Sequence, residues 1–99
     1  MTAVDVTCEP AGDGWRCRVS VADDRGASTH DVGVPRTGPH ADAMPPVPTT
    51  ADVEGLVRET FAFLLEREPR TSILARFELP VVARYFPDYP DAIRIRLSR

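Results

Sequence analysis

The sequence predicts an α+β fold in which a three-stranded antiparallel meander, about residues 3–34, packs against a C-terminal helical layer, about residues 51–98. Two observations lead to this prediction. Apolar and polar residues alternate through the first third of the chain, whereas large apolar residues return at helical spacing after residue 50. The chain has 99 residues, which suits a single domain, and residues 35–50 form a proline-rich linker between its two parts.

The first two strands are predicted from apolar residues that recur at every second position. These residues would face the core, and they are Val4, Val6, Cys8, Trp15, Cys17, Val19 and Val21. The turn between the strands reads Pro-Ala-Gly-Asp-Gly, and glycine and aspartate favour tight hairpin turns. A loop of residues 12–13 places Cys8 opposite Cys17, whereas a loop of residues 13–14 places Cys8 opposite Val19.

In both registers the sulfurs of Cys8 and Cys17 share the apolar face, where we expect two reduced, buried thiols. The N-terminus has no basic flank and no apolar segment typical of a secretory signal. The expected compartment is therefore the cytoplasm, which keeps thiols reduced. A disulfide is the alternative, because opposed strand residues come close enough to be bridged. We expect no metal site from these cysteines with His30 and His40, since the spacing matches no zinc-ligand pattern.

A third strand is predicted after a turn at residues 23–26, with one face formed by Ser28, His30, Val32 and Val34. In a meander, the first and third strands are the edges of the sheet, and Gly33 and Pro35 interrupt the third. We therefore expect a second copy to add a strand to the first strand, which would form a homodimer. A monomer whose first strand is covered by the proline-rich segment is the competing expectation, and a dimer through a helical face is also open.

A long helix is predicted after the linker, which holds five of the ten prolines and no periodicity. Thr49 or Thr50 would cap this helix, and Asp52 would lie in its first turn. The apolar stripe of the helix comprises Val53, Leu56, Val57, Thr60, Phe61 and Leu64. On its polar side, Glu54 and Arg58 have the spacing of an i,i+4 ion pair.

Prolines at positions 69, 80 and 87 divide the rest of the chain into short helices. We expect one helix over about residues 71–77, another that begins at Pro80, and a last one capped by Asp88 and beginning near Pro90. The first two of these, residues 73–86, also resemble a helix-turn-helix. Glu78 stands where such a unit usually has its turn glycine, and the second helix is short, which counts against this interpretation.

Residues 61–90 contain the sequence elements REP, SIL, F-x-L and YFP-x-YP. This segment resembles the C-terminal signature of a family of small bacterial proteins of unknown function, in which it follows a short β-rich N-terminus. The resemblance implies a shared fold. It implies no catalytic residue, cofactor or substrate.

The composition excludes several classes of enzyme. The chain has twelve arginines and no lysine, so it lacks the amine needed for Schiff-base chemistry, for pyridoxal phosphate attachment and for a nucleotide-binding loop. No GxGxxG or GxSxG motif is present, and no nucleophile, base and orienting group can be assembled. We therefore predict a protein that is not an enzyme, with no catalytic, cofactor-binding or metal-binding residues. No apolar run approaches the roughly 20 residues of a membrane-spanning helix, so no membrane partner is expected.

The charges are unevenly distributed along the chain. Residues 1–66 hold five arginines and eleven acidic residues, whereas residues 67–99 hold seven arginines and four acidic residues. No motif specifies the function. The leading hypothesis is a small non-catalytic protein-interaction or accessory domain, whose partner is another protein or a second copy. The alternative is a nucleic-acid-binding regulator that uses the arginine-rich C-terminal helices, with an affinity that falls as the salt concentration rises.

Overall fold

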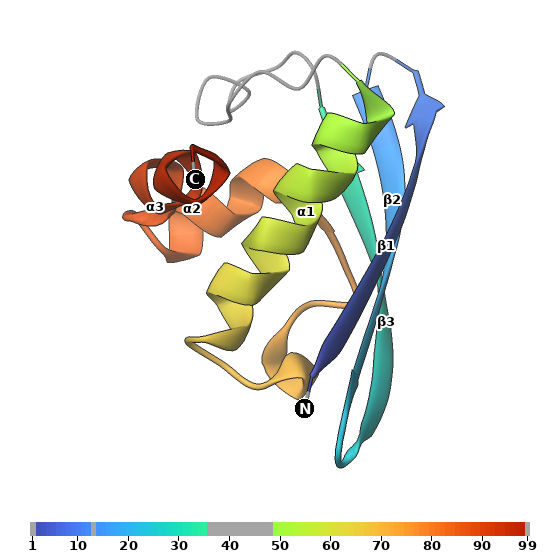
Figure 1. Cartoon of the computed structure of the whole chain (residues 1–99), viewed down its shortest axis with the longest axis vertical. Coiled ribbons are helices and arrows are strands. Elements are labelled where there is room, and N and C mark those ends of the chain that lie inside the picture. Colours follow the sequence, from blue (N-terminus) through green and yellow to red (C-terminus); the bar gives the residue numbers. More distant parts are fainter. Residues whose placement is uncertain (1, 13, 36–48, 99) are drawn as a thin grey trace.

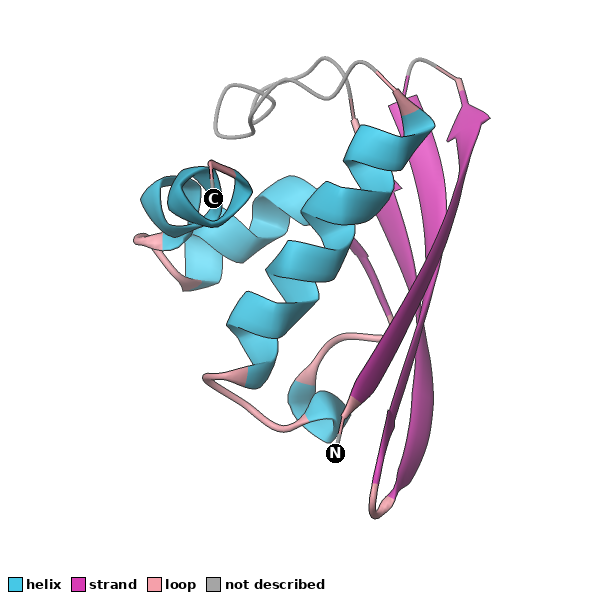
Figure 2. Ribbon diagram, viewed as in Figure 1, coloured by secondary structure: helices cyan, strands magenta, loops and turns pink. Residues whose placement is uncertain are grey.

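The computed structural model describes residues 2–12, 14–35 and 49–98. Its sheet has the order β1-β2-β3-β4, and its strands are β1 (Ala3–Ala11), β2 (Gly14–Asp23), β3 (Gly26–Val34) and β4 (Arg76–Glu78). The helices are α1 (Thr50–Leu65), α2 (Val82–Tyr85) and α3 (Tyr89–Leu97), with short 3₁₀ helices η2 (Arg70–Ser72) and η3 (Leu79–Val81). All the helices lie on the same side of the sheet (Figures 1 and 2), so the predicted α+β fold is confirmed.

The predicted antiparallel meander is formed by β1, β2 and β3, and its register is the first of the two alternatives. Cys8 is paired with Cys17, and Ala11 is paired with Gly14. The predicted core face is also correct, because the side chains of Val19, Val21 and Val32 are fully buried.

The two cysteines form a disulfide, which corrects the prediction of reduced thiols. Their direct opposition across β1 and β2 brings the Cα atoms to within 4.1 Å, which places the sulfurs side by side on the apolar face. The expected burial is confirmed, since Cys8 and Cys17 both belong to the core.

Helix α1 forms as predicted. Thr49 is its N-cap, and the Thr49 hydroxyl accepts a hydrogen bond from the Asp52 N–H at 3.1 Å. All six residues of the predicted stripe are buried. The expected pair between Glu54 and Arg58 is not formed. The Glu54 carboxylate instead accepts a hydrogen bond from the backbone N–H of Cys8, at 3.0 Å, which ties the first turn of α1 to β1.

The helix predicted over residues 71–77 is wrong. Only η2 is helical there, and the chain then extends into β4, where Phe77 pairs in parallel with Val32 of β3. Phe77 is buried between the exposed residues Arg76 and Glu78, and this alternation suits a strand. The Glu78 carboxylate lies over Gly33, in the space that a Cβ atom would occupy.

The absence of that helix corrects the expected sheet edges and bears on the helix-turn-helix resemblance. β3 is an inner strand rather than an edge, and the edges of the sheet are β1 and β4. A helix-turn-helix is also not formed, because its first helix would span β4.

The C-terminal helix α3 begins one residue before the predicted start, and Asp88 occupies its N-cap position. The Asp88 side chain makes no capping hydrogen bond. It accepts one from Arg67 Nη2 at 2.8 Å, and the Arg67 guanidinium also stacks on the Phe63 ring, 3.6 Å from the ring centroid. Arg67 therefore links the end of α1 to the start of α3.

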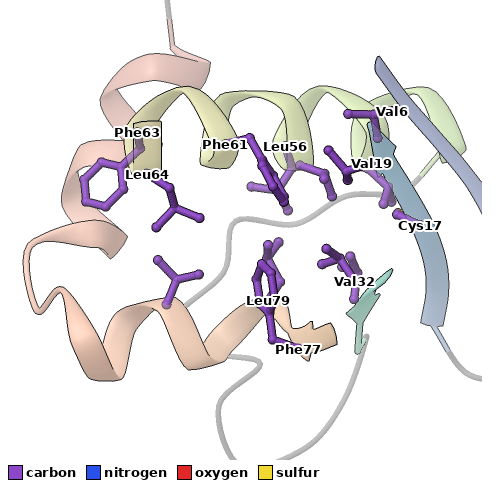
Figure 3. Close-up of a cluster of buried hydrophobic side chains, with 14 of the residues drawn as sticks. Val6, Cys17, Val19, Val32, Leu56, Phe61, Phe63, Leu64, Phe77 and Leu79 are labelled. Atoms are coloured by element: carbon purple, nitrogen blue, oxygen red, sulfur yellow. The ribbon is translucent and has the colours of Figure 1, made fainter. Parts of the chain in front are cut away.

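The core lies between the sheet and α1 and continues to the C-terminal segments. Phe61 points from α1 toward Phe77 and Leu79, with Val19 and Val32 of the sheet close by (Figure 3). At the α3 end, the buried hydroxyls of Thr60 and Tyr89 lie 2.7 Å apart in a hydrogen bond, and burial raises the pKa of Tyr89 well above its ordinary value. Among the described residues, no helix is both long and apolar enough to cross a membrane.

Candidate interaction groove

A groove of about 370 Å³ opens between the C-terminal end of α1, the segment that joins η2 to β4, and α2. Its walls are mostly apolar. They include Leu64, Ile73, Leu74, Phe77, Val82 and Phe86. Leu64 points from α1 toward the α2 side of the groove (Figure 3).

Local sequence explains why the groove stays open. Pro69 has extended backbone after α1 and precedes η2, and Pro80 lies at the start of η3. These breaks keep each C-terminal helical piece short, so the pieces line the end of α1 without filling the space beside it.

His30 holds one wall of the groove in place. Its ring is buried against Phe61, with the ring centroids 5.3 Å apart. The Nδ1 atom donates a hydrogen bond to the backbone oxygen of Leu74 at 2.8 Å, because a carbonyl oxygen can only accept, and Nε2 bonds with Ser28 Oγ at 2.9 Å. His30 therefore fixes the backbone from which the Leu74 side chain projects.

The rim of the groove exposes two large apolar side chains. Leu74 is 52% exposed and Tyr85 is 68% exposed. In the part of the chain that the structure describes, the other exposed large apolar side chains, Ile95 and Leu97, both lie on α3. Clustered exposure of this kind beside a concave surface marks interaction sites more often than single exposed apolar residues do.

Among the described residues, one charged residue, Glu68, lines the groove. Glu68 is half-buried, and within residues 2–12, 14–35 and 49–98 no cation pairs with it. The neighbouring arginines are directed elsewhere: Arg67 pairs with Asp88, and Arg70 Nε pairs with Asp23 Oδ2 at 3.0 Å. The groove is therefore an apolar surface with a single negative charge.

The groove also lies beside the open edge of the sheet at β4, since Phe77 of this strand lines it. The Asp31 N–H donates to Ala75 O at 2.8 Å. In a parallel pair of strands, this bond identifies which residues of β4 direct their backbone groups toward β3 and which direct them away. Phe77 directs its backbone groups toward β3, whereas Arg76 directs its N–H and C=O outward and Glu78 its N–H. The Glu78 C=O is used within the fold, because Glu78 is the N-cap of η3. Because β4 ends the sheet, these outward groups have no neighbouring strand.

The opposite edge, β1, is partly protected. The close Cα approach of Cys8 and Cys17 is typical of a pair without mutual hydrogen bonds, so the Cys8 N–H points away from β2. Glu54 accepts that N–H, and Pro10, two residues further on, has none. Open donors on this edge are therefore confined to the part of β1 before Cys8.

The grouping of Cys8, Cys17, His30 and His40 considered from the sequence is not assembled. Both sulfurs are in the disulfide, both ring nitrogens of His30 have partners, and His40 lies outside the described residues. No cluster of three or more possible metal ligands occurs in the described ranges. The proline-rich segment expected to cover β1 also falls mostly outside them.

Most arginines after residue 66 are already paired with carboxylates. Of the six arginines in the described residues 67–98, five lie within 4 Å of an acidic group: Arg67, Arg70, Arg76, Arg94 and Arg96. Arg96 contacts both Glu59 and Glu66. Neutralised side chains of this kind offer little free charge to a phosphate backbone.

Sequence reasoning named none of the groove residues as a site. A signal was present in the spacing of the three prolines, which predicts short, imperfectly joined elements, but the position of Glu68 within the groove depends on the fold. No family model, curated protein or solved structure matches the chain, so the resemblance of residues 61–90 stays a prediction.

Proposed function

We propose that this protein is a small non-catalytic interaction domain that binds a segment of a partner protein in the groove beside Glu68. The observation that carries the proposal is the exposure of Leu74 and Tyr85 at the rim of a mostly apolar groove. Each exposes its apolar surface to water in the free protein, and a bound segment would bury it. Removing such surface from water contributes about 25 cal/mol per Å².

A protein partner is better supported than a nucleic acid. The described residues of the groove lining include a carboxylate and no arginine, and a carboxylate repels phosphate. The described arginines of the alternative hypothesis are mostly paired. The cytoplasm remains the expected compartment, and the disulfide would be reduced there in most proteins. Neither cysteine lines the groove, so we expect binding in both thiol states.

Site-specific cross-linking in the native cell tests the proposal. A photo-cross-linking phenylalanine analogue replaces Leu74 in one variant and Thr29, an exposed residue of β3 on the other side of the sheet, in a matched control. We expect position 74 to join one defined segment of a partner protein, and position 29 not to join it. Adding Tyr85→Asp should abolish the product at position 74.

The captured segment is then synthesised and titrated into the purified protein. We expect it to perturb the NMR signals of groove residues such as Ile73 and Val82, and to bind at least tenfold more weakly to a Leu74→Asp variant. Equal cross-linking at positions 74 and 29, or a segment that binds both proteins equally, contradicts the proposal.

A further inference from the structure

We propose that the occupant of the groove is an extended peptide segment that carries an apolar and a basic side chain two positions apart, and that this segment pairs its backbone with the outer edge of β4. This inference rests on the proposed function and adds the chemistry of the partner. It follows from the open strand edge, the apolar lining and the carboxylate of Glu68, which lie together.

The open edge of β4 requires an extended occupant. Arg76 directs its N–H and C=O away from β3, and Glu78 directs its N–H the same way, whereas the Glu78 C=O accepts the first hydrogen bond of η3. Both residues are exposed. A helix satisfies its own backbone groups and could not use these, whereas an added strand pairs with them directly. The short length of β4 limits this pairing to a few hydrogen bonds, so the side chains must supply the rest of the affinity.

The apolar position follows from the pleat of the strand. Side chains alternate between the two faces of an added strand, and those on the same face as Phe77 point toward the helices. Phe77 lines the groove with Leu74 and Val82 around it. A partner side chain on this face therefore enters an apolar space of about 370 Å³, where an aliphatic or aromatic residue is favoured.

The basic position follows from Glu68. This half-buried carboxylate is the one charged group among the described lining residues, and no described cation pairs with it. A second inward-facing side chain of the partner, two residues from the apolar one, would cross the same groove. An arginine or lysine fits there because its aliphatic stem contacts the apolar walls while its charged end pairs with the carboxylate.

Other possible occupants fit the groove less well. An acidic segment would place like charges together, and a nucleic acid would do the same with its phosphates. A second copy could insert Ile95 or Leu97 from α3, but that contact joins two different surfaces, so it leads to open assemblies unless a ring closes. Self-association through the groove would thus appear as polymerisation.

A displayed library of random peptides, screened against the purified full chain, tests the inference. We expect enriched sequences with an apolar residue and, two positions away in either direction, arginine or lysine. An enriched peptide should bind about tenfold more weakly to Glu68→Gln, as expected for a lost charge-assisted hydrogen bond. The matched control is Glu9→Gln, which removes an exposed carboxylate on β1 and should leave the affinity unchanged.

Backbone methylation of the same peptide tests strand pairing. N-methyl groups at alternate positions should abolish binding, and those at the intervening positions should have little effect, because a strand directs every second N–H toward its neighbour. Peptides that bind in the groove without a basic preference, or without this alternation, overturn the inference and leave the proposed function standing. If no peptide binds and the analogue at position 74 yields no cross-link, both the inference and the proposed function are wrong.

Discussion

Asp23 joins the turn between β2 and β3 to the helical layer. Its Oδ1 atom accepts the N–H groups of Arg25 and Gly26, at 2.8 and 3.1 Å, and its Oδ2 atom accepts Arg70 Nε at 3.0 Å. Gly26 has φ +148°, a conformation that favours glycine, and a Cβ atom there would lie 2.8 Å from Arg70 Nη2. The arginine that anchors η2 therefore lies directly against the turn.

This arrangement predicts a specific response to acid. The pKa of Asp23 lies below its ordinary value of 3.8, chiefly because the Arg25 N–H donates to the carboxylate; burial opposes the shift and Arg70 adds to it. Since the pKa is lowered by folding, the stabilisation is fully present above about pH 4 and is lost as the pH falls through the folded-state pKa. Asp23→Asn should lower stability at pH 7 and flatten its decline below pH 4, as measured by urea denaturation across pH. Asp5→Asn, on exposed β1, is the control, and equal acid responses of wild type and Asp23→Asn would contradict the assignment.

At the scale of whole elements, the meander and α1 were predictable because their signals are local and repeated. Period-two alternation in β1 and β2 and the stripe from Val53 to Leu64 each extend over several turns or residue pairs. β4 was not predictable, because three residues carry almost no periodicity and its pairing joins Phe77 to Val32 across 45 positions of sequence. The groove is harder still to predict from the sequence, since it is the space left by the packing of short elements.

The disulfide marks a different limit of sequence reasoning. The turn allowed two registers, and the expected compartment favoured thiols, although the register that forms places Cys8 directly opposite Cys17. The burial of both cysteines was predictable from the alternation of side chains along each strand, because that alternation places them on the apolar face in either register.

Reduction of this bridge should destabilise the domain. The cysteines are nine residues apart, and a cross-link that closes a loop of this length stabilises by about 2–3 kcal/mol, through restriction of the unfolded chain. We expect a phosphine reductant to lower the free energy of unfolding by that amount in urea titrations. The double variant Cys8→Ala, Cys17→Ala should be insensitive to the reductant, and a wild-type protein equally insensitive would show that the bridge contributes nothing.

At the scale of the molecule, the two edges of the sheet differ in how they are protected. On β1, Glu54 accepts the Cys8 N–H and Pro10 removes a further donor, whereas β4 is short and adjoins the groove. Edge strands are commonly protected by charges, prolines and short length, and this fold uses all three. Association through β1 is thereby restricted to Ala3–Thr7, while β4 is the edge with an apolar surface beside it.

The homodimer through β1 remains a prediction, and the structure makes its test selective. The Val6 N–H has the same outward direction as that of Cys8, because the two residues are two positions apart. Val6→Pro therefore removes a donor from the open edge without removing a β1–β2 hydrogen bond.

If β1 pairs with a second copy, sedimentation at micromolar concentration should show a wild-type dimer that dissociates in Val6→Pro and tightens in Glu54→Ala, which frees the Cys8 N–H. Thr7→Pro, whose N–H faces β2, serves as the unfolding control, with circular dichroism to confirm that the other variants are folded. A monomeric wild-type protein, or a folded Val6→Pro variant that still dimerises, would place any self-association elsewhere than β1.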